Sequence, residues 1–178
     1  MKMIRLIAVA WAWASPAAVA HDGTIAFAGA VTAQTCVVEP ISNGAHDGNN
    51  FTVELRNVHA SSLNAAGKRG AAIPFQLVVG SATQPCPYRT VRGTFRSTGD
   101  TNAAGRLTNQ GTARNVDVVM MNANYQDIDL NTGGNTMAAQ IDPVLGVGVI
   151  YWHASYHATA AVTPGTVFSQ VEYVLTYE

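Results

Sequence analysis

Short stretches of alternating or β-branched residues, separated by clusters of turn-forming residues, run through most of this chain. A half-buried strand alternates apolar and polar residues with a period of two, whereas an amphipathic helix repeats its apolar residues every three or four positions. No segment sustains the helical period, and only residues 61–67 favour a short helical turn. Strands are predicted over residues 24–39, 51–57, 73–80, 90–97, 115–121, 147–158 and 166–177. The sequence therefore predicts one all-β domain, most simply an immunoglobulin-like sandwich.

The first twenty residues have the pattern of a secretory signal peptide. Lys2 and Arg5 precede an apolar core from Leu6 to Ala14 that is too short to cross a bilayer, and Ala18-Val19-Ala20 supplies small residues for cleavage. Cleavage there would leave residues 21–178, which is enough chain for one domain. No later apolar run has the length of a transmembrane helix, so we expect export without membrane insertion.

The charge balance argues against nucleic acid as a partner. Without Lys2 and Arg5 the chain holds eight basic and eleven acidic residues, and only Lys68 remains as a lysine. A nucleic-acid-binding domain normally gathers its basic residues into a stripe or patch, and none is visible here.

Cys36 and Cys86 are the only cysteines in the chain. Export would bring them into an oxidising compartment, where two free thiols are less expected than a disulfide. Closing a loop of about 50 residues would stabilise the fold by roughly 4 kcal/mol in the chain-entropy model. We therefore predict a structural disulfide between them.

Four stretches, taken in order, carry the pattern of one protein family. The first is the alternating strand from Gly23 to Val37, which has Gly29 near its centre and Cys36 near its end. The second and third are residues 53–79, with a Pro-Phe strand after a helical turn, and residues 113–131. The fourth is residues 156–177, in which Gly165 is fourteenth from the C-terminal end and Tyr177 is penultimate. In these features the chain resembles the pilus subunits of the bacterial chaperone–usher pathway, particularly the major subunit of type 1 fimbriae. Residues 81–85, inserted before Cys86, depart from the family pattern.

The resemblance implies an incomplete immunoglobulin-like sandwich that lacks its last strand and leaves an apolar groove beside its C-terminal strand. Residues 1–20 would be the signal peptide, residues 21–35 an N-terminal donor-strand extension, and residues 36–178 the pilin domain. A periplasmic chaperone would first lend a strand to the groove. At the outer-membrane usher, the extension of an identical or related pilus subunit would replace it, which is a recognised form of strand addition. The expected function is a structural subunit of an adhesive surface fimbria, exported through the periplasm to the cell surface, with no enzymatic activity and no cofactor.

The resemblance also assigns roles to residues at both ends of the chain. The donor strand would use Ile25, Phe27, Gly29 and Val31, with Gly29 at a point of close backbone approach. The groove and chaperone edge would use Gly165, Val171, Tyr173, Leu175 and Tyr177. The same apolar patterns would arise if the N-terminal segment were an ordinary first strand of the sandwich and the C-terminal segment an ordinary last strand. Gly165 also suits a simple turn after Pro164.

Two other functions compete with this interpretation. A mature N-terminal His21 suggests a secreted copper-dependent polysaccharide oxygenase, whose second imidazole ligand would come from His46, His59, His153 or His157. However, His21 precedes a strand that the donor role explains better, and no HExxH metal motif is present. A tip adhesin would need an additional lectin domain, for which residues 21–178 leave no room, so a stalk or adaptor subunit is expected.

Overall fold

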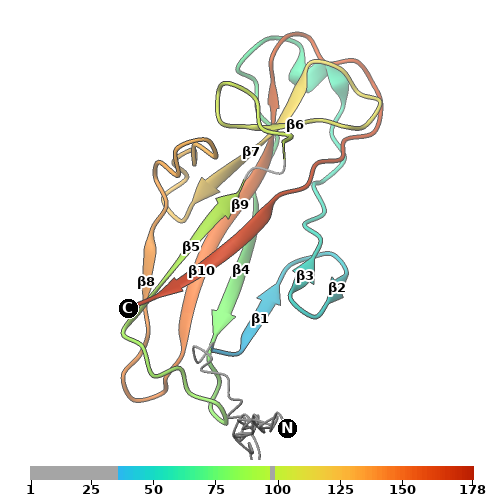
Figure 1. Ribbon diagram of the computed structural model, residues 1–178. Helices are drawn as coiled ribbons and strands as arrows, with labels where there is room; N and C mark the ends of the chain where they lie inside the picture. Colours follow the sequence, from blue (N-terminus) through green and yellow to red (C-terminus); the bar gives the residue numbers. More distant parts are fainter. Residues whose placement is uncertain (1–35, 97–98) are drawn as a thin grey trace, which may run out of the picture. The chain divides into compact units, whose positions relative to one another are not determined.

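A computed structural model describes residues 36–96 and 99–178, all of which belong to one compact unit. Two antiparallel sheets make up this unit, with strand orders β1-β4-β9-β7-β6 and β10-β5-β8, and β2 and β3 form a separate hairpin (Figure 1). The strands are β1 (Val38–Ile41), β2 (His46–Asp47), β3 (Asn50–Phe51), β4 (Ile73–Val79), β5 (Thr90–Arg96), β6 (Leu107–Thr108), β7 (Val116–Asn122), β8 (Ala138–Gln140), β9 (Gly148–Ala158) and β10 (Glu172–Tyr177). One 3-10 helix, η1 (Ala60–Leu63), joins β3 to β4. Among the described residues, no helix is both long and apolar enough to span a membrane.

The core lies between the two sheets. One face of β4 and one face of β5 contribute to it, whereas all seven residues of β7 are buried. In β4, Phe75, Leu77 and Val79 are buried and alternate with more exposed residues, as the period of two requires. Phe95 of β5 and Trp152 of β9 meet across the core with ring centroids 5.0 Å apart. The predicted all-β sandwich is confirmed.

Most of the predicted strands are present within one or two residues of their expected bounds. The predicted helical turn is also present, as η1. The strand predicted over 24–39 is observed only as β1, because residues 24–35 lie outside the described residues. Two predictions are partly wrong: residues 52–57 and 166–171 form no strand ladder. Strands β6 and β8, with two and three residues, are too short to show a period and were not predicted.

The predicted disulfide between Cys36 and Cys86 is present, with Cα atoms 5.2 Å apart and a sequence separation of 50. The inserted residues 81–85 close on themselves, because Ser81 and Gln84 exchange backbone hydrogen bonds of 3.0 and 3.2 Å. Gly80 precedes this turn with a φ of 81°, and its N–H donates to the carbonyl of Val37 at 2.8 Å. The insertion therefore adds a surface turn and leaves Cys86 beside the start of β1.

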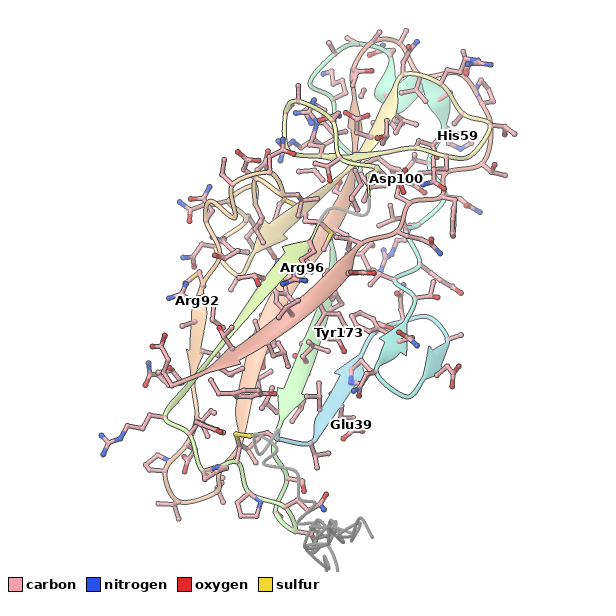
Figure 2. The ribbon with its side chains drawn as sticks, viewed as in Figure 1. Glu39, His59, Arg92, Arg96, Asp100 and Tyr173 are labelled. Carbon is pink, nitrogen blue, oxygen red and sulfur yellow. A yellow bond between two sulfur atoms is a disulfide. The ribbon has the colours of Figure 1, made fainter. Side chains whose placement is uncertain are left out.

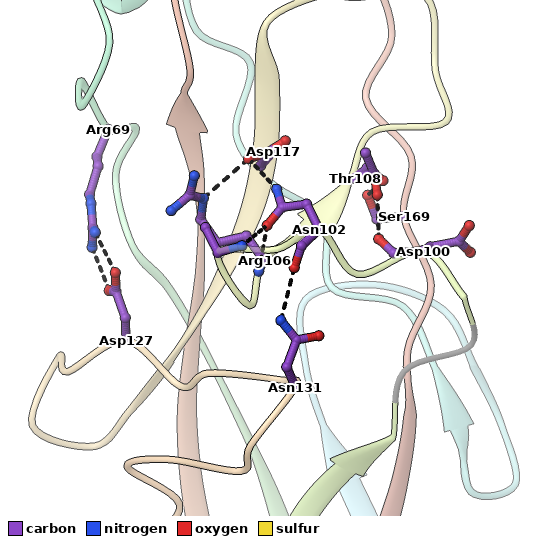
Figure 3. A network of polar contacts seen from close by, with 10 residues as sticks. Arg69, Asp100, Asn102, Arg106, Thr108, Asp117, Asp127, Asn131 and Ser169 are labelled. Atoms are coloured by element: carbon purple, nitrogen blue, oxygen red, sulfur yellow. Dashed lines mark hydrogen bonds and ion pairs between the residues drawn. The ribbon is translucent and has the colours of Figure 1, made fainter.

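A buried carboxylate ties the loops at one end of the sandwich to the larger sheet. Asp117 of β7 is 6 % exposed and accepts hydrogen bonds from Asn102 Nδ2 at 2.7 Å and Arg106 Nε at 3.1 Å (Figure 3). Asn131 Nδ2 in turn donates to the carbonyl of Asn102 at 2.9 Å. The ion pair of Arg69 and Asp127 in the same view is more open, with side chains 37 % and 41 % exposed.

We expect Asp117→Asn to destabilise the protein by about 2 kcal/mol, because it leaves the partly buried Arg106 without its counter-charge. Asp127→Asn is the matched control, and it should cost less than about 1 kcal/mol because solvent screens the exposed pair. Urea unfolding of both variants measures the difference. Equal losses in the two variants would contradict a structural role for the buried network.

Candidate functional site

An apolar groove of about 1600 Å³ runs between two extended segments, residues 52–58 and 162–171. Neither segment pairs with the other, so the cavity between them reaches the core of the sandwich. The floor consists of core side chains from strands of both sheets, namely Phe75, Phe95, Leu107, Val118, Met120 and Ala154. Apolar side chains from both segments complete the walls, so the cavity is suited to other apolar side chains and not to a charged ligand.

The first wall, residues 52–58, has its hydrogen bonds on one side only. Thr52 N–H donates to the carbonyl of Ala45 at 2.8 Å, and Glu54 N–H donates to Asn43 Oδ1 at 2.9 Å. Val53 and Leu55 alternate with these two residues and turn half-buried side chains toward the core. Within the described part of the chain, the N–H and C=O groups of Val53 and Leu55 have no hydrogen-bond partner. This wall therefore presents a strand edge to the groove.

The second wall, residues 162–171, repeats this arrangement. Thr166 and Phe168 bond outward to residues 109–113: Ala113 N–H donates to the carbonyl of Thr166 at 3.0 Å, and Phe168 N–H donates to Asn109 Oδ1 at 2.8 Å. Val167 lies between them with its side chain half-buried against the core. The backbone groups of Val167 likewise lack a partner among residues 36–96 and 99–178.

Both ends of the groove are closed by contacts between the walls or their neighbours. At one end, Val162 N–H donates to the carbonyl of Leu63 at 3.0 Å. At the other end, Tyr173 Oη donates to the carbonyl of Asn49 at 2.8 Å, and the rings of Phe51 and Tyr173 lie 6.0 Å apart. Burial raises the pKa of Tyr173 above its ordinary value, so this phenol is a neutral donor at physiological pH.

This geometry can bind an extended peptide. Two facing edges with unpaired backbone groups supply the hydrogen bonds of a β-ladder, and the apolar floor accepts alternate side chains. An unpaired edge beside an open core is also an aggregation hazard, which proteins normally avoid by covering it. Among the described residues, both edges and the core between them are therefore left uncovered.

The residues predicted for the C-terminal side fall into two groups. Gly165, Val171 and Tyr173 line the groove. Leu175 and Tyr177 lie further along β10, where both pack against the core and Tyr177 stacks on Tyr88 with ring centroids 5.2 Å apart. The predicted donor residues Ile25, Phe27, Gly29 and Val31 lie outside the described residues.

Sequence reasoning did not assign the first wall to the site. Phe51, Val53 and Leu55 alternate with polar residues, and this pattern led to the strand predicted over 51–57. Nothing in the pattern shows that one edge of that strand lacks a partner. Val167 was missed for the same reason.

Gly165 is required for close packing at the groove wall. A Cβ on this residue would collide with the backbone N and Cα of Ala113. We expect Gly165→Ala to cost about 1–3 kcal/mol, because backbone atoms cannot yield as a flexible side chain would. Gly134→Ala is the control, since its Cβ would meet only side-chain atoms, the nearest at 3.3 Å. Thermal unfolding of the two variants checks this, and equal stabilities would show that the wall can shift.

The histidines of the described residues form no metal centre. No group of three or more His, Cys, Asp or Glu residues there has the geometry to hold a metal ion. His153 stacks on Tyr125 with ring centroids 4.1 Å apart, and burial lowers the pKa of His157. His59 is exposed beside η1 (Figure 2). His21, the first ligand of the oxygenase hypothesis, lies outside the described residues.

Comparisons with known proteins agree on one family. The family model described as "Fimbrial protein" matches residues 25–178. The chain is 34% identical to the major fimbrial subunit SMF-1 of Stenotrophomonas maltophilia (strain K279a), covering 90% of this chain and 95% of the relative. It is 31% identical to the F17 fimbrial protein of Escherichia coli, covering 99% of both chains. The fold is similar to that of the P pilus rod subunit PapA, with a TM-score of 0.54 and 17% identity over 87% of this chain and 100% of PapA. From the family model and these two relatives, the chain belongs to the fimbrial protein family.

Proposed function

We propose that this protein is a structural subunit of a surface fimbria and assembles by strand donation. In this mechanism, residues 23–33 of one copy fill the groove of the next copy. The observation that carries the proposal is the pair of facing strand edges, residues 52–58 and 162–171, over an open apolar core. A strand inserted there would at once satisfy backbone groups of both walls, such as those of Val53 and Val167, that have no partner among the described residues.

The N-terminal segment has the composition that such a groove requires. Ile25, Phe27 and Val31 share one strand phase, and the other phase holds mainly Ala and Thr. Burying three such side chains contributes roughly 5–9 kcal/mol before the cost of ordering the segment. Gly29 lies in the same phase, where it would allow a close backbone approach to the groove floor.

The same groove explains why the subunit needs partners before assembly. An exposed edge beside an open core would aggregate in the periplasm, so a periplasmic chaperone would occupy the groove first. An outer-membrane usher would then exchange that strand for residues 23–33 of the next subunit. The assembled protein would lie in a fimbrium at the cell surface and have a structural role instead of an enzymatic one.

A synthetic peptide of residues 22–34 tests this proposal. Added in excess to the assembling full-length protein, it should occupy the grooves, stop fibre growth and raise the melting temperature. At 100 times its dissociation constant, such a ligand stabilises the folded state by about 2.7 kcal/mol. The matched control is the same peptide with Asp in place of Phe27 and Val31. If both peptides act alike, or neither does, the proposed function is wrong.

A further inference from the structure

The hairpin of β2 and β3 covers one end of the groove but belongs to neither main sheet. Among the strands of the described residues, its two strands pair with each other alone, His46 with Phe51 and Asp47 with Asn50. Across the gap, Tyr173 of β10 donates its hydroxyl hydrogen to the carbonyl of Asn49 at 2.8 Å. Figure 2 shows Tyr173 in the space between β10 and β3. We use the term hairpin clasp for the contacts of Tyr173 with Asn49 and Phe51.

The hairpin clasp lies where an inserted strand would have to continue. A strand added along the free edge of β10 places alternate side chains between the two sheets. At the level of Tyr173 this space is already filled, because the Phe51 ring lies 6.0 Å from Tyr173 and 5.9 Å from Phe75 of the core. Incoming side chains therefore cannot enter at that level until the hairpin moves away from β10.

We propose that residues 45–51 form a gate that the hairpin clasp holds closed and that opens when a strand enters the groove. This regulation rests on the proposed function of the groove. The gate needs little energy to open, because the hairpin has no ladder to either sheet and its carbonyl at Asn49 is exposed to water. A closed gate would also cover part of the core in a copy whose groove is empty.

The gate makes binding depend on the fraction of molecules that are open. For a ligand that binds only the minor open state, the apparent dissociation constant is the intrinsic one divided by the open fraction. A substitution that raises the open fraction therefore lowers the apparent dissociation constant. One neutral hydrogen bond has a net value that corresponds to roughly a threefold to tenfold change in an equilibrium constant. Removing the Tyr173 hydroxyl should therefore raise both the association rate and the affinity for the strand by about this factor.

The test compares Tyr173→Phe with Tyr177→Phe in a full-length chain whose own N-terminal segment carries Phe27→Asp and Val31→Asp to prevent donation. Both substitutions remove one hydroxyl from the same face of β10, but the Tyr177 hydroxyl has no hydrogen-bond partner among the described residues. The probe is the fluorescently labelled peptide of residues 22–34, followed by stopped flow. Without peptide, hydrogen exchange of residues 45–51 reports on the gate itself.

We expect Tyr173→Phe to bind the peptide roughly threefold to tenfold faster than the parent chain, and Tyr177→Phe to bind at the parent rate. Amide exchange in residues 45–51 should accelerate only in Tyr173→Phe. Equal binding rates in all three chains, or unchanged exchange in Tyr173→Phe, would overturn the gate and leave strand donation intact. If no chain binds the peptide, strand donation is wrong and the gate is overturned with it.

Discussion

A full-length chain carrying Phe27→Asp and Val31→Asp should form no fibres. Both side chains belong to the phase that we expect to enter the groove, and an ionised carboxylate in an apolar cavity without a partner costs several kcal/mol. The cost of burying two such charges exceeds the roughly 5–9 kcal/mol that burial of Ile25, Phe27 and Val31 contributes in the parent chain. Electron microscopy of the purified, assembling protein measures the result directly.

The opposite phase of the same strand supplies the control. Ala28→Asp and Ala30→Asp add the same two charges to the neighbouring positions, which would face solvent in an inserted strand. This variant should still assemble, with at most a modest loss of rate. Loss of fibres in both variants would point to net charge, and fibres from the Phe27→Asp, Val31→Asp chain would refute strand donation by this segment.

Replacing both cysteines with serine should cost about 4 kcal/mol, which is the chain-entropy value for a loop of this length. The disulfide closes a separation of 50 residues, and Cys86 is only 4 % exposed. A loss of this size should lower the melting temperature by about 8–16 °C for a domain of this length. Thermal unfolding of the double variant and the parent chain gives the comparison.

The single variants Cys36→Ser and Cys86→Ser provide the control for the crosslink. Each removes the same covalent bond, so each should lose nearly as much stability as the double variant. If reducing agent leaves the parent chain unchanged, the disulfide adds little and the prediction fails. A much smaller loss in Cys36→Ser than in the double variant would assign the effect to the buried Cys86 side chain instead.

Much of the sandwich was predictable because β4 and β5 are buried on one face, while β7 is a mainly apolar run that is buried throughout. The alternation in β4 and the long run of β9 identify strands without any knowledge of their partners. The 3-10 turn was also predictable in position, though the structure moves it to residues 60–63. By contrast, β6 and β8 exist because neighbouring strands hold them, and a two- or three-residue segment carries no period of its own.

The groove could be only partly predicted, for a physical reason. Alternation reports which side chains face the core, and Val53, Leu55 and Val167 face it half-buried although no strand of the described residues lies beside them. Hydrogen-bond pairing in a sheet depends on backbone groups, and the pattern of side chains does not report whether those groups have partners. The resemblance at Gly165 and Tyr177 directs attention to the C-terminal segment. The outward hydrogen bonds of Thr166 and Phe168 then identify which backbone edge of that segment is open.

The disulfide has a mechanical consequence in a fibre built by strand donation. Tension along such a fibre would enter each subunit through its N-terminal segment and arrive at Cys36. The next element, β1, has four residues and, in the part of the chain that the structure describes, pairs with β4 alone. So short an edge strand would peel easily when pulled from one end. Because Cys36 is bonded to Cys86, part of the load passes at once to the chain leading into β5, in the other sheet. In such a fibre the crosslink would therefore spread tension over both sheets before β1 has to bear it.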